Sequence, residues 1–152
     1  MERRALDIKR DYEALLNMQR LSWDINFPTL EFNKEAFHRS LCDAARREEV
    51  YIYEIDGEIV GWLWLDLRTP PLGGHVRHIQ VERRRWGQGV GRAIMEDAIS
   101  LCCEKRCPHI TLNVTKSNAK AVRLYKHLGF EPVNDHGERM RMKRELEDQQ
   151  VV

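Results

Sequence analysis

The stretch Val81-Glu-Arg-Arg-Arg-Trp-Gly-Gln-Gly-Val-Gly-Arg92 carries most of the information about this chain. Its glycines alternate at positions 87, 89 and 91. An apolar run at 75–81 predicts a strand before them, and an amphipathic run at 92–105 predicts a helix after them. Glycine lets the backbone approach a ligand, and a helix N-terminus offers unpaired N–H groups with partial positive charge. This order of elements predicts a phosphate-binding loop.

Two common phosphate loops do not fit these glycines. No Lys-Ser/Thr pair follows them, which excludes a P-loop, and neither register completes Gly-x-Gly-x-x-Gly, because Arg92 and Ile94 stand at its last position. Without a ligand, a tight turn would need only one or two glycines. Three glycines flanked by the arginines at 83–85 and 92 therefore favour a bound ligand over a simple turn.

A second segment lies about 30 residues further on, Asn118-Ala-Lys-Ala-Val-Arg-Leu-Tyr125-Lys-His-Leu-Gly-Phe130. Asn118 and Tyr125 are seven residues apart in a predicted helix, so their side chains project from one face. Taken alone, Asn118 could simply begin the helix and Tyr125 could be a half-buried packing residue.

Together, in this order, the two segments resemble the GNAT superfamily of acetyl-CoA-dependent N-acetyltransferases. The family has Gln/Arg-x-x-Gly-x-Gly/Ala in the loop and Asn-x-x-Ala-x-x-x-Tyr before Gly-Phe, and the resemblance covers about 51–146. Aligning Gly89-Val-Gly91 with the loop pattern puts Trp86 where the family has Gln or Arg. A register shifted to Arg84 restores the arginine, but the first register keeps the usual spacing from the strand to the helix.

The resemblance implies an α/β (α+β) fold, a single domain over 1–146 with residues 147–152 as a disordered tail. Its central sheet would be mixed and mostly antiparallel, with two splayed parallel strands at 75–81 and 109–114, flanked by about four helices. An Asp56-Gly57 hairpin turn agrees with this order. The expected helices cover 11–21, a segment after Asn33, 92–105 and 117–127, and 23–30 is expected to be a loop.

The resemblance also implies how acetyl-CoA binds and reacts. The pantetheine arm would hydrogen-bond the strand backbone and the pyrophosphate would bind the loop, with Asn118 holding the cofactor from the next helix. An amine would attack the thioester directly, with Tyr125 protonating the departing thiolate. The expected cofactor-binding residues are Ile79, Gln80, Val81, Gly87, Gln88, Gly89, Val90, Gly91, Arg92 and Asn118.

The resemblance does not assign the base that deprotonates the amine. His75 and His78 both lie on the first splayed strand, and strict alternation would place them on opposite faces, with His75 on the face of Ile79 and Val81. His75 is therefore the expected base, and a packed histidine with a base acting through water is the alternative.

The acceptor site is expected to form from the first two helices and the loops at 23–30, 66–74 and 134–138. Their acidic and aromatic residues would suit a cationic amine. They are Trp23, Asp24, Phe27, Asp66, Asp135 and Glu138. A non-catalytic acyl-CoA-binding or regulatory module of the same fold is the main alternative, and an RNA-binding or protein-interaction domain that uses Arg83 to Arg85 is another.

Bulk composition narrows the other possibilities. The formal net charge of the 152 residues is +1, which gives no reason to expect bulk nucleic-acid binding. No apolar run is long enough for a membrane helix, and the N-terminus does not read as a signal peptide, so we expect a cytoplasmic protein. The four cysteines match no common zinc spacing, so no metal is expected. Many members of the resembled family dimerise, which makes a homodimer one expected assembly.

Overall fold

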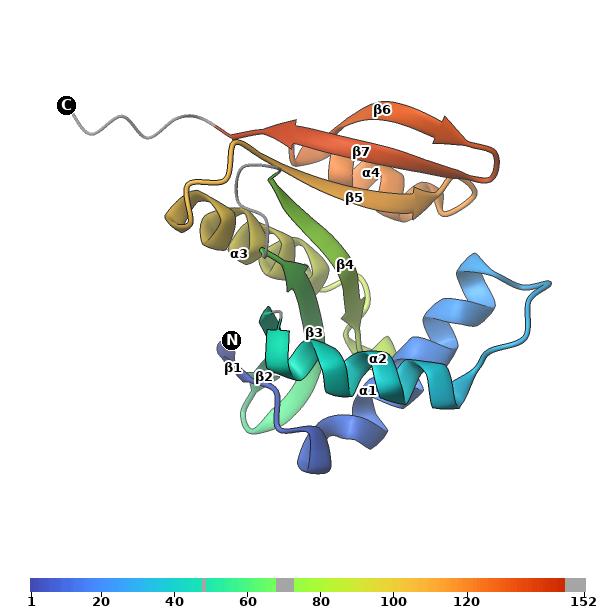
Figure 1. Cartoon of the computed structure of the whole chain (residues 1–152), viewed down its shortest axis with the longest axis vertical. Helices are drawn as coiled ribbons and strands as arrows, with labels where there is room; N and C mark the ends of the chain where they lie inside the picture. The colour runs from blue at the N-terminus through green and yellow to red at the C-terminus, as the bar shows by residue number, and fades with distance from the viewer. Residues whose placement is uncertain (48, 68–72, 147–152) are drawn as a thin grey trace.

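The structure is a computed structural model that describes residues 1–47, 49–67 and 73–146. Its strands form one seven-stranded sheet in the order β1-β2-β3-β4-β5-β7-β6 (Figure 1). All neighbours are antiparallel except β4 and β5, which confirms the predicted mixed sheet. The strands are β1 (Glu2–Ala5), β2 (Glu49–Ile55), β3 (Glu58–Asp66), β4 (Gly74–Val81), β5 (His109–Thr115), β6 (Glu131–His136) and β7 (Arg139–Glu145).

Four α-helices cover the two faces of the sheet. They are α1 (Ile8–Asn26), α2 (Lys34–Arg47), α3 (Val90–Glu104) and α4 (Ala119–His127), with a short 3-10 turn at Arg83–Arg85. The buried side chains of α1 and α2 pack on one face against Trp62 and Trp64. Those of α3 and α4 pack on the other face, around Leu63 and Leu65. Alternate residues of β3 thus serve opposite cores, as the two-residue period of a strand requires.

The parallel pair β4 and β5 separates along its length. Pairing is confined to Gly74–Val76 on β4 and Ile110–Leu112 on β5, and the strands diverge beyond it (Figure 1). The predicted splaying is confirmed. Both cavities described below are lined by residues of β4 from this separated part.

A bulge in β4 corrects the expected positions of the two histidines. Trp64 pairs with His78 but Leu65 pairs with Val76, so Arg77 is an extra residue in β4. Paired residues share a face, and Asp66, the partner of His75, lies on the same face of β3 as Trp64. His75 and His78 therefore lie on one face, away from Ile79, and the strict alternation assumed from the sequence was wrong.

Helix α1 is longer than the sequence suggested. It runs to Asn26 and ends just before Pro28, because a residue that precedes proline disfavours the helical conformation. Trp23, expected in a loop, lies in its last turn and donates from Nε1 to the carbonyl of Leu30 at 2.8 Å. This extra turn brings Ser22 and Asn26 to the cavities.

Two expectations fall outside the described residues: the tail at 147–152 and most of the loop at 66–74. In the part of the chain that the structure covers, no helix combines the length and apolar character needed to cross a membrane.

Candidate active site

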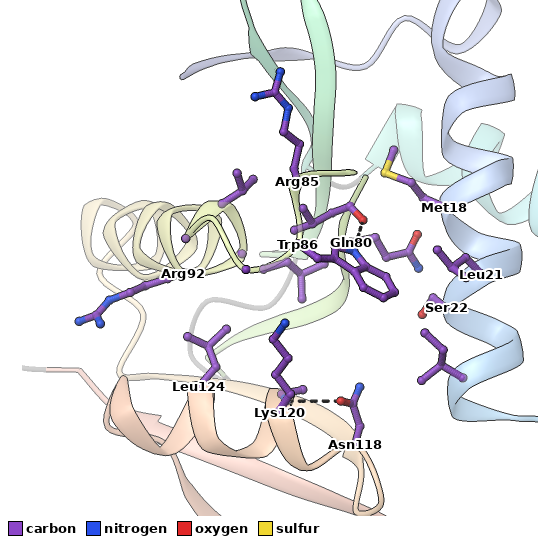
Figure 2. Close-up of a pocket in the computed structure, with 18 of the residues that line it drawn as sticks. Met18, Leu21, Ser22, Gln80, Arg85, Trp86, Arg92, Asn118, Lys120 and Leu124 are labelled. Atoms are coloured by element: carbon purple, nitrogen blue, oxygen red, sulfur yellow. Dashed lines mark hydrogen bonds between the residues drawn. The ribbon is translucent and has the colours of Figure 1, made fainter. Parts of the chain in front are cut away.

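The first cavity lies between the glycine loop, α1 and α4, and its volume is about 360 Å³ (Figure 2). Backbone and apolar groups dominate its lining. From the expected cofactor residues it takes Ile79, Gln80, Val81, Gly87, Gly89, Val90, Gly91, Arg92 and Asn118. The one expected residue that does not line it is Gln88, whose Nε2 donates to the carbonyl of Arg84 at 3.1 Å.

The glycines of the loop have separate roles. Gly87 and Gly89 have φ of 78° and 81°, in the left-handed region that other residues rarely adopt, and Gly89 is the N-cap of α3. Gly91 has ordinary backbone, and a Cβ there would lie 3.6 Å from Val81 Cγ2, an ordinary contact. The first two glycines thus set the turn that directs the N-terminus of α3, where N–H groups lack helical partners, to the cavity.

Trp86 occupies the position where the family pattern has Gln or Arg. Figure 2 shows its side chain projecting across the cavity toward Leu21 on α1, and 43% of it is exposed. Its Nε1 donates to the carbonyl of Val81 at 2.8 Å. The indole N–H thus takes the place of the side-chain N–H donors that a glutamine or arginine would have at this position.

The second cavity lies on the other side of the gap between β4 and β5, with a volume of about 390 Å³. It is lined by side chains from α1, β4, β5, α4 and β7. They include Trp23, Phe27, Arg77, His78, Asn113, Thr115 and Arg139. Among the described residues, no Asp or Glu lines it.

The carboxylates that the sequence suggested for an acceptor site do not line the second cavity. Of the carboxylates proposed from the sequence, Asp66 pairs with Arg77 at 3.2 Å and Asp135 pairs with Lys116. Neither lines the second cavity, and neither do Asp24 and Glu138. Two of the aromatic residues from the same expectation, Trp23 and Phe27, do line it, with their ring centres 4.7 Å apart.

Tyr125 lines both cavities, which share the wall formed mainly by Ser22, Asn26, Gln80 and Asn118. It is 9% exposed and makes an edge contact with Phe130, whose ring centre lies 6.1 Å away. Burial raises the pKa of Tyr125 to about 12, so the phenol stays protonated at neutral pH. A protonated phenol can donate a hydrogen bond to an anion on either side of this wall.

The two histidines of β4 differ in their access to the cavity. His78 lines the second cavity and stacks on Trp62 at 5.5 Å, with an interplanar angle of 17°. Burial, followed by the charges of Arg77 and Arg139, lowers its pKa to about 4. His75 lines neither cavity, and its Nδ1 lies 2.8 Å from Thr111 Oγ1 in the paired part of the two strands.

Asn118 begins α4, as the simpler interpretation had it, and also lines both cavities. Its Oδ1 accepts from the amide of Ala121 at 3.3 Å, and its Nδ2 donates to Asn26 Oδ1 at 3.5 Å. The residue is thus a helix cap that also connects α4 to α1. The free positions on its amide group are limited, but its side chain stays at the junction of the cavities.

A chain of buried amides fixes the wall between the cavities. Trp62 Nε1 donates to Gln80 Oε1 at 2.7 Å, and Gln80 Nε2 donates to Gln19 Oε1. Gln19 and Gln80 are 6% and 7% exposed. Because buried polar groups must find partners, this chain holds β4 in a defined position relative to α1.

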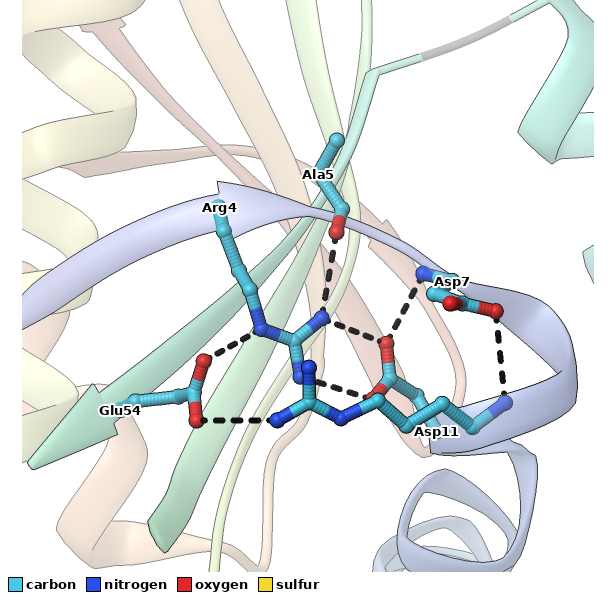
Figure 3. A network of polar contacts seen from close by, with 6 residues as sticks. Arg4, Ala5, Asp7, Asp11 and Glu54 are labelled. Atoms are coloured by element: carbon cyan, nitrogen blue, oxygen red, sulfur yellow. Dashed lines mark hydrogen bonds and ion pairs between the residues drawn. The ribbon is translucent and has the colours of Figure 1, made fainter. Parts of the chain in front are cut away.

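An ion-pair network anchors the start of α1 to the sheet (Figure 3). Both Nη atoms of Arg4 donate to Asp11, at 2.7 and 2.8 Å, and Arg4 Nε donates to Glu54. Asp11 is fully buried. Burial acts to raise its pKa, but hydrogen bonds from Arg4 and from the Asp7 amide outweigh burial and lower it. The network therefore positions α1, whose residues line both cavities.

Sequence reasoning missed the contribution of α1 to the first cavity. Met18, Leu21, Ser22, Ile25 and Asn26 all line it. Their spacing continues the helical period of Leu15 and Met18, a signal that would have extended the helix beyond residue 21. Arg139 was also missed, and a single arginine at the start of a strand offers no signal of its own.

Comparison with known proteins identifies the family. The family model for the acetyltransferase (GNAT) family matches residues 12–130, so the match includes most of α1, well before residue 51 where the resemblance was expected to begin. The L-amino acid N-acetyltransferase AaaT of Escherichia coli K12 is 39% identical over 128 residues, which are 80% of this chain and 78% of that protein. A mycothiol acetyltransferase of Acidothermus cellulolyticus is 33% identical over 94 residues, which are 53% of this chain and only 29% of that protein.

A solved structure agrees with the fold. The PaiA N-acetyltransferase of Thermoplasma acidophilum, in complex with coenzyme A, aligns with a TM-score of 0.79 over 95% of this chain and 98% of that chain, at 18% identity. The fold, the glycine loop before α3 and the match over residues 12–130 agree with the predicted resemblance. The chain belongs to the GNAT acetyltransferase family.

Proposed function

We propose that this protein transfers the acetyl group of acetyl-CoA to a primary amine, with the cofactor in the first cavity and the amine in the second. The observation that carries the proposal is the position of Tyr125, which lines both cavities at their common wall. Thioester and amine would meet at this wall, so the amine could attack the thioester directly in a ternary complex, without a covalent enzyme intermediate.

The glycine loop supports binding of the cofactor in the first cavity. The α3 N-terminus directs backbone N–H groups into it, which suits a pyrophosphate. Beyond Val76, β4 no longer pairs with β5, so its backbone can pair with an extended arm, as an added strand would. The residues proposed for this role are Ile79, Gln80, Val81, Gly87, Gly89, Val90, Gly91, Arg92 and Asn118. Gln88 keeps only its backbone amide as a possible contact.

Tyr125 is proposed to protonate the departing thiolate. Its pKa of about 12 lies above that of a thiol, near 8.5, so transfer is favourable only within a hydrogen bond formed as charge develops on sulfur. Tetrahedral oxyanion stabilisation would come from a backbone N–H of Ile79 to Val81.

For the base we favour His78 over His75, because only His78 lines the acceptor cavity. With a pKa of about 4, its imidazole is neutral at physiological pH and can accept a hydrogen bond from the amine. It is too weak a base to keep the proton, so the proton passes on to water.

The decisive experiment measures release of free thiol from acetyl-CoA with a panel of amines, for the wild type and for Tyr125→Phe. We expect thiol release that Tyr125→Phe strongly reduces. A non-catalytic acyl-CoA-binding module would instead show thermal stabilisation by CoA and no thiol release with any amine. The names of relatives point to different primary amines: free amino acids for AaaT and an alanine of ribosomal protein bS18 for a Bacillus subtilis relative.

A further inference from the structure

Among the residues that the structure describes, the lining of the second cavity has cationic and neutral polar groups and no Asp or Glu. Of its two arginines, Arg77 pairs with Asp66 at 3.2 Å. Arg139 has no carboxylate of the described residues within 4.0 Å. Its Nη1 donates to Thr115 Oγ1 at 3.0 Å, which occupies one of the five donors of a guanidinium.

The position of Arg139 is fixed although its charge is unmatched. Its Cζ lies 4.9 Å from the centre of the Phe27 ring, and its backbone pairs with Thr115 across β5 and β7. Burial lowers the pKa of Arg139, which means that the surroundings disfavour its charge. Charges taken out of water are normally paired, so an oriented, partly buried guanidinium in a cavity points to an anionic group on the ligand.

We propose that Arg139 binds the carboxylate of the acceptor and that the acceptor is a free amino acid. This inference rests on the proposed function and specifies its substrate class. A planar guanidinium matches a carboxylate with two parallel hydrogen bonds. The rings of Trp23 and Phe27 line the same cavity and suit an apolar or aromatic side chain. A protein N-terminus would present an amide in place of the carboxylate and would leave Arg139 unmatched.

The first test uses wild-type protein and three matched acceptors. These are L-phenylalanine, L-phenylalaninamide, which replaces the carboxylate by a neutral amide, and phenethylamine, which lacks it. We expect kcat/KM for L-phenylalanine to exceed both others by about tenfold or more, the usual size of a charge-assisted pair. The amine of the amide loses its proton more readily, so the comparison understates any preference for the carboxylate.

The second test changes Arg139 and a matched arginine on the same strand. Arg139→Gln should raise the KM for L-phenylalanine by about 10- to 100-fold, leave the KM for acetyl-CoA unchanged and alter the rate with phenylalaninamide little. Arg139→Lys should restore part of the loss. Arg144→Gln is the control, because Arg144 lies further along β7, opposite Ile110, and lines neither cavity. It should behave as the wild type.

The outcomes separate this inference from the proposed function. Equal rates with the three acceptors, or an Arg139→Gln variant that slows all three alike, would overturn the carboxylate assignment while acetyl transfer stands. Faster acetylation of a peptide with N-terminal phenylalanine than of L-phenylalanine would overturn it in favour of a protein N-terminus. If no amine releases CoA, the proposed function fails and this inference with it. Should Arg139→Gln lose its thermal transition, the wild-type series still decides.

Discussion

The two cavities are built in different ways although they share a wall. The first depends largely on consecutive residues, from Ile79 to Arg92, and on the backbone conformation of two glycines. The second depends on side chains that five separate elements bring together, among them His78 and Arg139. Among the described residues, its lining includes Arg77 and Arg139 and no Asp or Glu. A local motif can therefore predict the lining of the first cavity, but the lining of the second depends on packing.

The largest effect is expected for a change at the wall that the two cavities share, at Tyr125. Replacing Tyr125 by Phe removes the only hydroxyl proposed to reach the thiolate and keeps the packing against Phe130. We expect kcat to fall by about 10²- to 10⁴-fold, as for loss of a general acid. CoA should still raise the thermal midpoint by the wild-type amount, because the glycine loop is untouched. An unchanged kcat would show that proton delivery comes from elsewhere.

Helix α1, which lines both cavities, is held to the sheet by Arg4. Arg4→Met leaves the fully buried Asp11 without its bidentate partner, and we expect the free energy of unfolding to fall by about 3–5 kcal/mol. Urea denaturation measures this. Arg10→Met is the control, because Arg10 is 63% exposed and lies 3.8 Å from Glu54, so its loss should be small. Equal losses for the two variants would contradict the assigned role of the buried pair.

The second cavity should respond to acid through His78. Its pKa is about 4 in the folded protein and near 6.5 when unfolded, and it lies near Arg77, Arg139 and His75. Above pH 6.5 His78 is neutral in both states, so it adds no pH dependence there. As the pH falls from 6.5 to 4, the unfolded state binds the proton first, and the free energy of unfolding decreases. The difference amounts to about 3 kcal/mol. His78→Phe keeps an aromatic ring beside Trp62 and should remove this part of the pH dependence. Parallel curves for variant and wild type would contradict it.

A smaller effect, on stability and on the KM for acetyl-CoA, is expected for a change in the glycine loop. Gly89→Ala forces a Cβ into left-handed backbone, and we expect a loss of stability of about 1–2 kcal/mol together with a higher KM for acetyl-CoA. Gly91→Ala is the matched control two residues on, since its backbone is ordinary and its Cβ would meet Val81 at 3.6 Å. It should lose little or no stability. If both variants lose equally, space rather than backbone conformation constrains the loop.

Local patterns predicted most of the fold. Strand alternation, the Asp56-Gly57 turn and the helical period gave the order of elements, and the family resemblance implied the mixed sheet with its splayed parallel pair. Errors arose where a local rule met a tertiary constraint. The length of α1 was underestimated because aromatics near Pro28 suggested a loop, and the bulge at Arg77 reversed the face of His75.

The sequence by itself determined the glycine loop of the first cavity, because glycines with positive φ before a helix N-terminus act through backbone groups whose positions follow from consecutive residues. It also placed Tyr125 on the same helix face as Asn118. Only the tertiary structure decided the lining of the second cavity. The packing of His78 against Trp62 and the strand pairing of Arg139 with Thr115 bring together residues that lie far apart in the chain. Long-range packing sets these contacts, and no local spacing records them.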